Sequence, residues 1–184
     1  LPKACPPGPP CQIYATLPFE TSTSVFLNIH THVDVKTITI KYETKQNYLA
    51  HGNLTLKFEA NEFISPSAFD IKGERNIYSV LFSDLLPETN YVFEIFYNGK
   101  SQKNITYHTL PSPTSKNPYN LIYGGDIGLS SIATNLTEIA REQKPLAMVI
   151  GGDFAYDNGE PSCSYVLDQA LKMFQDVVNE PLDR

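Results

Sequence analysis

The hydrophobic periodicity of this chain changes once, across a segment rich in proline, serine and asparagine at residues 110–120. Before this segment apolar and polar residues alternate. A period of two is that of strands with one face on a core, and about seven short runs of this kind predict an antiparallel β-sandwich. The alternating apolar positions are Val25, Leu27, Ile29, Ile38, Ile40, Leu54, Leu56, Phe58, Tyr78, Val80, Phe82, Tyr91, Phe93, Ile95 and Tyr97.

After the segment the pattern indicates strands that alternate with helices. Residues 121–123 and 146–150 are short apolar runs, and a helical period follows each run, over about 130–143 and 164–179. The order β-α-β-α predicts two parallel strands that are buried on both faces. In the first helix, Ser130 or Ser131 is placed to cap the N-terminus, and one face carries Ile132, Leu136, Ile139 and Ala140.

We therefore expect two domains and a linker. Residues 1–112 are the N-terminal β-sandwich, residues 113–120 are the linker, and residues 121–184 are the start of an α/β domain. Two strands and two helices cannot cover a buried parallel sheet, so the apolar faces of this last part need more chain. The first residues include no initiating Met and no signal peptide, and we interpret them as a processed or trimmed end.

The net charge of −6 belongs to the second part of the chain. Residues 1–117 carry 10 acidic and 10 basic side chains, whereas residues 118–184 carry 10 acidic and 4 basic ones. Without a basic face, nucleic acid is not expected as a partner, and no apolar run approaches the roughly 20 residues of a membrane span. The acidic segment is either a solvated surface or a cation site.

Cysteines and glycosylation sequons favour a secreted or luminal glycoprotein, whether extracellular, lysosomal or vacuolar. Cys5 and Cys11 bracket a proline-rich hexapeptide and could pair, which leaves Cys163 free or paired with a cysteine outside this chain. The candidate glycosylation sites are Asn53, Asn104 and Asn135, each in an Asn-x-Thr sequon.

Both apolar runs of the second part end in two glycines and an aspartate. The sequences are LIYGGDIG at residues 121–128 and AMVIGGDFAY at residues 147–156. Ligands of open α/β sheets bind beyond the carboxyl ends of parallel strands, so neighbouring strands would bring Asp126 and Asp153 into one crevice. Two carboxylates held close together need a proton or a cation between them. The alternative is that each Gly-Asp pair only forms a turn.

The stretch LFSDLLPETNYVFEIFY at residues 81–97 resembles the fibronectin type III signature. In that family a Leu-x-Pro-x-Thr-x-Tyr run turns the chain between two sheets, and here Leu85, Pro87, Thr89 and Tyr91 match it by type and order. The resemblance implies that the Tyr91 ring is buried and that its hydroxyl bonds to nearby backbone.

The sequences GDIG at residues 125–128 and GDFAY at residues 152–156 resemble the first two motifs of the metallophosphoesterases, GDxG and GDxxY. The tyrosine variety is typical of the purple acid phosphatases, which also carry a fibronectin-like sandwich before the catalytic domain. The resemblance implies an acid phosphatase that cleaves phosphate monoesters with a metal-bound hydroxide. It further implies that Asp126 and the Tyr156 phenolate bind Fe(III) and that Asp153 bridges to a second metal, which is zinc, iron or manganese.

Four further ligands of that family, in three later motifs, are not in this sequence, so three of seven are present. We therefore expect residues 1–184 to be the N-terminal part of a larger enzyme, inactive alone, whose partner is the remaining part of the catalytic domain. The sequence leaves open whether the protein forms a homo-oligomer. All four histidines, His30, His32, His51 and His108, precede the linker, and His30 with His32 could bind a metal, although solvent-facing or satisfied strand histidines are commoner.

Two other functions compete with the phosphatase. The first is a structural or adhesive glycoprotein that keeps a phosphatase-like scaffold without its chemistry, since fibronectin-type sandwiches can make contacts through their edge strands. The second is a phosphodiesterase, because the two motifs alone do not distinguish phosphate monoesters from diesters.

Overall fold

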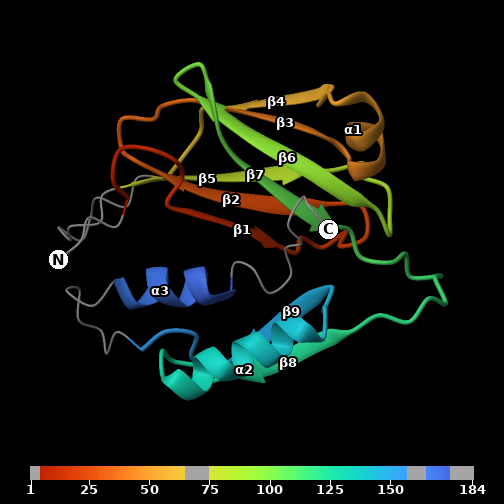
Figure 1. Ribbon diagram of the computed structural model, residues 1–184, viewed down its shortest axis with the longest axis vertical. Coiled ribbons are helices and arrows are strands. Elements are labelled where there is room, and N and C mark those ends of the chain that lie inside the picture. The colour runs from red at the N-terminus through yellow and green to blue at the C-terminus, as the bar shows by residue number, and fades with distance from the viewer. Residues whose placement is uncertain (1–4, 65–74, 157–164, 175–184) are drawn as a thin grey trace.

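The computed structural model describes residues 5–64, 75–156 and 165–174. It contains an antiparallel β-sandwich and a smaller α/β unit that lies along one side of the sandwich (Figure 1). The predicted β-sandwich followed by a partial α/β fold is confirmed. The sandwich strands are β1 (Gln12–Thr16), β2 (Val25–Thr31), β3 (Ile38–Thr44), β4 (Leu56–Ala60), β5 (Asn76–Phe82), β6 (Asn90–Tyr97) and β7 (Lys100–His108), with helix α1 (Lys45–His51) between β3 and β4; the α/β unit comprises β8 (Leu121–Gly125), α2 (Ser131–Glu142), β9 (Ala147–Gly151) and α3 (Tyr165–Phe174).

Two sheets form the sandwich, one of three strands in the order β1-β2-β5 and one of four in the order β4-β3-β6-β7. Most of the residues that alternate in the sequence face inward, and burying each large side chain stabilises the fold by roughly 1.5–3 kcal/mol. Aromatic rings fill the centre, where Phe82 meets Phe93 edge-on with ring centroids 5.0 Å apart. The fully buried core residues include Ile13, Val25, Leu27, Ile29, Ile38, Ile40, Tyr78, Phe93 and Ile95.

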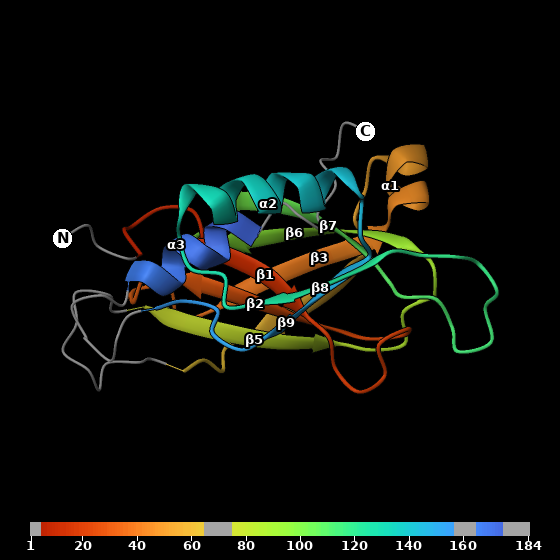
Figure 2. The same cartoon turned by 90° about the horizontal axis from the view of Figure 1, so that it is seen from below.

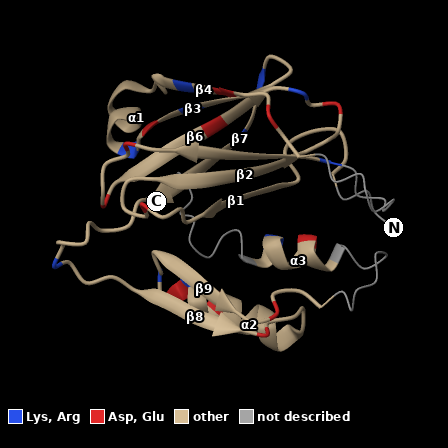
Figure 3. Ribbon diagram, turned by 180° about the vertical axis from the view of Figure 1, so that it is seen from behind, with Lys and Arg blue, Asp and Glu red and all other residues tan. Residues whose placement is uncertain are grey.

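The tight turn between β6 and β7 is made by residues that readily adopt positive φ angles. Asn98 and Gly99 join β6 to β7 with φ angles of 52° and 69°. Two successive positive φ values give the turn whose twist matches that of a hairpin, and Asn-Gly is the pair that adopts it most readily. Among the strands of the sandwich, acidic and basic side chains are mixed within the four-stranded sheet, and the three-stranded sheet carries none (Figure 3).

The corner between β5 and β6 is formed as the fibronectin-like signature implies. The Tyr91 ring is buried, and its hydroxyl accepts a hydrogen bond from the Leu86 N–H at 2.9 Å. Leu85 is buried beside it, and the Leu85 N–H donates to the Thr23 carbonyl across the two loops. The tyrosine therefore fixes the crossing of the chain from one sheet to the other.

One sandwich segment differs from the sequence prediction. The strand predicted from Leu54 begins at Leu56, and a short helix, α1, precedes it. Thr44 caps this helix by accepting from the Asn47 N–H, and Gly52 ends it in the left-handed conformation. Strand β4 lies at a sheet edge, so the side chains of Leu56 and Phe58 stay partly exposed and are not core residues.

The N-terminal segment is fastened to the sandwich. Cys5 and Cys11 form a disulfide, which is the pairing that their spacing suggested. The Cys11 N–H donates to the His30 carbonyl at 3.0 Å, and the Tyr97 hydroxyl donates to the Gly8 carbonyl within the disulfide loop. Cys163 lies outside the described residues.

In the α/β unit, α2 and α3 lie side by side (Figure 2) and β8 pairs with β9 in parallel. Ser130 caps α2 by accepting from the Ala133 N–H at 3.1 Å, as predicted. The prediction that the two strands are buried on both faces is wrong for the described chain, because Tyr123 is 80% exposed. The predicted apolar face of α2 is likewise open, since only Ala140 of its four residues is buried. The exposed large apolar residues of β8, β9 and α2 are Leu121, Tyr123, Val149, Ile132, Leu136 and Ile139.

In the described ranges, no helix is both long enough and apolar enough to cross a membrane.

Removing the Tyr91 hydroxyl tests the corner. Tyr91→Phe leaves the Leu86 N–H without its acceptor, and we expect the free energy of unfolding of the sandwich to fall by about 1–2 kcal/mol in urea denaturation. Tyr107→Phe is the matched control. The Tyr107 hydroxyl is buried and finds no hydrogen-bond partner among the described residues, so its removal should cost less than about 0.5 kcal/mol. Equal losses for both variants would contradict this account of the corner.

Candidate metal centre

Parallel pairing brings the two glycine-aspartate motifs together. Strands β8 and β9 are in register from Leu121 and Ala147 to Gly125 and Gly151, so they end side by side. Asp126 follows β8 directly and Asp153 follows β9 by two residues. Beyond the strand ends the two segments stay joined, because the Ile127 N–H donates to the Asp153 carbonyl at 3.0 Å.

Tyr156 turns back toward the first motif. Its hydroxyl donates a hydrogen bond to Asp126 Oδ1 at 3.1 Å. The ring lies over Gly128, where an added Cβ would be 3.5 Å from Tyr156 Cδ2. A Cβ at this distance would make only ordinary contact with the ring, so the final glycine of GDIG is favoured by its φ of 62° and not by the space that Tyr156 needs, and inspection of the sequence missed the contact of Tyr156 with this glycine.

The electrostatics of the site keep the phenol protonated. Partial desolvation, the hydrogen bond to Asp126 and the negative charges of Asp126 and Asp153 all raise the pKa of Tyr156 above its ordinary value. Ionisation of this phenol next to two carboxylates would need a positive charge to offset the repulsion. The three side chains together are an oxygen-rich donor set of the kind that a hard cation prefers.

Glycine is needed at positions 125 and 152 because the chain segments at the strand ends lie very close to each other. A Cβ added to Gly125 would lie 1.6 Å from the Gly151 carbonyl oxygen. Gly152 has φ of +80°, and a Cβ there would lie 3.0 Å from Asp126 Oδ2. Asp126 itself has φ of 51°, an uncommon conformation for a residue other than glycine, and such strain is concentrated at functional sites.

No histidine of the described chain contributes to this site. His30 is buried in the sandwich, 3.2 Å from Arg75 NH1, and His32 Nδ1 accepts a hydrogen bond from the Asp34 N–H at 3.3 Å. Among the described residues, no group of three or more histidine, cysteine, aspartate and glutamate side chains could hold a metal ion. Each of the two strand histidines therefore has a hydrogen-bond partner of its own within the sandwich.

Comparison with known proteins finds one similar sequence over part of the chain and similar folds over nearly all of it. No model of a known protein family matches the chain. Purple acid phosphatase 23 of Arabidopsis thaliana is 30% identical over 115 residues, which cover 58% of this chain and 25% of that protein. The structure of purple acid phosphatase PPD1 from yellow lupin (Lupinus luteus) seeds superimposes with a TM-score of 0.69 at 13% identity, covering 95% of this chain and 34% of that one.

The structure of PhoD also shares the fold, with a TM-score of 0.64 at 14% identity over 92% of this chain and 38% of that one. This chain therefore resembles purple acid phosphatases, in sequence over part of its length and in its fold of a β-sandwich followed by part of an α/β domain. It spans about a quarter of the length of the curated relative that it matches.

Adding one methyl group at adjacent glycines tests the close approach of the strands. Gly125→Ala puts a carbon into the Gly151 carbonyl, and we expect the free energy of unfolding of the α/β unit to fall by about 3 kcal/mol or more. Gly124→Ala is the control, because an added Cβ there meets nothing within 4 Å, and it should be neutral or slightly stabilising. Hydrogen exchange of the β8 and β9 amides in urea measures both. Similar protection in the two variants would show that the strand ends are not in contact.

Proposed function

We propose that this chain is the N-terminal part of a metal-dependent acid phosphatase that hydrolyses phosphate monoesters. The observation that carries the proposal is the contact of Tyr156 with Asp126 at the paired ends of β8 and β9, with Asp153 beside them. A strand-end crevice of an α/β sheet is where such folds bind ligands. Two acidic side chains and a phenol there form a group that phosphate, itself an anion, would approach only with cations present.

The residues present fit Fe(III) and a second divalent metal, which would be zinc, iron or manganese. Fe(III) is a hard cation that prefers anionic oxygen ligands, and it would remove the repulsion that keeps the Tyr156 phenol protonated. In this assignment Asp126 and Tyr156 would hold the ferric ion, and Asp153 would be a ligand of both metals. When bound, the metals would activate water and neutralise the charge of the phosphate group.

The chain's own residues would prepare this site. The β8–β9 pairing fixes the spacing of the two aspartates, and the glycines let the strand ends approach without side-chain clashes. The hydrogen bond from Tyr156 to Asp126 orients the phenol oxygen toward the same side. Positioning of this kind reduces the reorganisation that metal binding would otherwise require.

We also propose that further chain completes the α/β domain. The exposed apolar residues of β8, β9 and α2 form surfaces that a parallel sheet normally buries, and the remaining metal ligands would come with the chain that covers them. In this division residues 1–112 are the sandwich, 113–120 the linker and 121–184 an incomplete catalytic domain. Residues 1–184 alone should not hydrolyse phosphate esters.

The proposed setting is a secreted or luminal compartment. The disulfide of Cys5 and Cys11 supports it, because disulfides persist in oxidising compartments. Asn53, Asn104 and Asn135 are all exposed, so glycans at these three sequons would not disturb the packing.

Removing one hydroxyl tests the metal assignment in the complete encoded protein loaded with Fe(III) and zinc. Wild-type protein should absorb in the visible through charge transfer from the phenolate and hydrolyse p-nitrophenyl phosphate at acidic pH. Tyr156→Phe should lose the absorption band, and Asp153→Asn should lose activity by about 100-fold or more.

Tyr119→Phe removes the same group from an exposed position that precedes β8 and should keep both colour and activity. A complete, folded protein that is colourless and inactive would favour the non-catalytic scaffold. Higher kcat/KM for bis(p-nitrophenyl) phosphate than for the monoester would favour a phosphodiesterase.

A further inference from the structure

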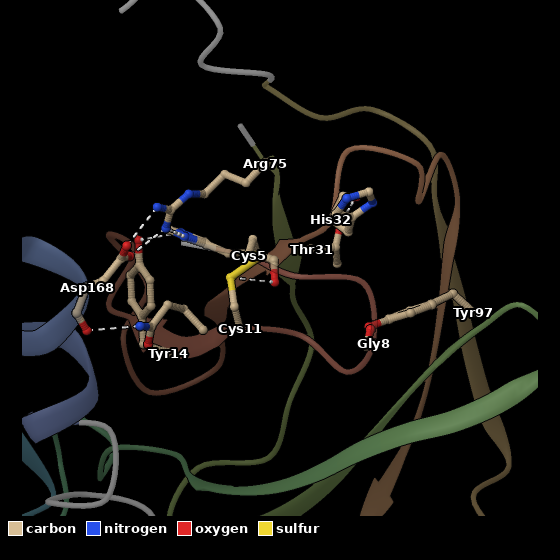
Figure 4. Close-up of a disulfide and its surroundings, with 11 residues drawn as sticks. Cys5, Gly8, Cys11, Tyr14, Thr31, His32, Arg75, Tyr97 and Asp168 are labelled. Carbon is tan, nitrogen blue, oxygen red and sulfur yellow. Dashed lines mark hydrogen bonds and ion pairs between the residues drawn. A yellow bond between two sulfur atoms is a disulfide. The ribbon is translucent and has the colours of Figure 1, made fainter. Parts of the chain in front are cut away.

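A buried cluster of charged and polar side chains joins the sandwich to α3. Arg75, just before β5, donates two hydrogen bonds to the Asp168 carboxylate in the first turn of α3, at 2.5 Å and 2.7 Å. The two side chains are only 10% and 15% exposed. Gln12 of β1 reinforces the contact by donating to the Asp168 carbonyl at 2.9 Å (Figure 4 shows Arg75, Tyr14 and Asp168 pointing toward one another).

His30 of β2 is the third member of the cluster. Arg75 NH1 lies 3.2 Å from His30 Nδ1, and a guanidinium can only donate. The imidazole must therefore be neutral, with its proton on Nε2, which lies 3.5 Å from the Tyr14 hydroxyl. The cluster then contains one positive and one negative charge, and the imidazole accepts from Arg75 as an uncharged base.

Protonation of His30 would disrupt this arrangement twice. It would turn the acceptor of Arg75 into a donor, and it would place a second positive charge beside the guanidinium in a buried site. Burial of the ring and the charge of Arg75 accordingly lower the pKa of His30 to about 4, although Asp168 acts in the opposite direction. The groups that face His30 are Tyr14 from β1, Arg75 from the segment before β5 and Asp168 from α3.

We propose that Arg75, Asp168 and His30 form an acid-sensitive latch that holds α3 on the sandwich at neutral pH and releases it on acidification. The latch rests on the interface geometry and does not depend on the proposed phosphatase chemistry. Its position matters because α3 follows the Asp153–Tyr156 segment in the chain.

The direction of the pH effect follows from linkage. In the latched state His30 stays neutral down to about pH 4, whereas a solvated histidine titrates near 6.5. Above pH 6.5 neither state binds the proton and the latch is at full strength. Between pH 6.5 and about 4 the released state binds the proton first, and the latching equilibrium should weaken by up to tenfold per pH unit, on the order of 100-fold in all.

The test measures the distance between α3 and the sandwich in the full chain. Spin labels at Lys57→Cys on β4 and Lys172→Cys on α3, both exposed, report it by pulsed electron paramagnetic resonance in a Cys163→Ser background. At pH 7.5 we expect one narrow distance distribution, and at pH 4.5 a broadened or longer one. His30→Gln keeps a hydrogen-bond acceptor for Arg75 but has no group that titrates in this range. Its distance distribution should therefore stay narrow at both pH values.

Breaking the ion pair should open the latch at every pH. Asp168→Asn, which leaves the sandwich unchanged, should give the broad distribution at pH 7.5 as well. Glu138→Gln is the matched control, because it breaks the exposed Glu138–Arg141 pair on α2 and should behave as the wild type. A distribution that broadens equally at pH 4.5 in wild type and His30→Gln would overturn the proposal, as would a narrow distribution for Asp168→Asn.

Discussion

The parallel pairing of β8 and β9 sets the geometry on which the candidate centre depends. Register from Leu121 and Ala147 to Gly125 and Gly151 makes the two strands end together, and the glycines permit an approach that no larger residue would allow. Asp126 and Asp153 are near each other because of this pairing, and Tyr156 then completes an oxygen-rich group through its bond to Asp126. The position of the proposed metal ligands is therefore set by how closely the backbones of the two strands pack, and the side chains supply the ligand atoms at that position.

Several parts of this picture could be predicted from the sequence. Alternation identified the inward residues of β2, β3, β5 and β6, because each of these strands has one face on the sandwich core. The Leu-x-Pro-x-Thr-x-Tyr run predicted the buried ring of Tyr91 and its bond to backbone. The repeated Gly-Gly-Asp predicted that two aspartates would meet at neighbouring strand ends, since parallel strands place their carboxyl ends at one edge.

Other features depend on context that no local pattern contains. Helix α1 is short and carries no buried residue, so it has no apolar period to detect. The apolar side chains of β4 and α2 are exposed, since an apolar residue shows what a face can bury but not whether a neighbour covers it. Arg75 and Asp168 are 93 residues apart in sequence, and their pairing is visible only once α3 lies on the sandwich. That contact makes the sandwich a structural support of the α/β unit and not merely a neighbour joined by a linker.

The most direct test of the central claim is a crystal structure of the complete encoded protein grown with Fe(III), with anomalous scattering measured at the iron edge. The account predicts an anomalous peak at the ends of β8 and β9, bound by the Asp126 carboxylate, the Asp153 carboxylate and the Tyr156 phenolate oxygen. A map with no peak there, in which Asp126 and Asp153 point apart and the Tyr156 hydroxyl faces elsewhere, would contradict it.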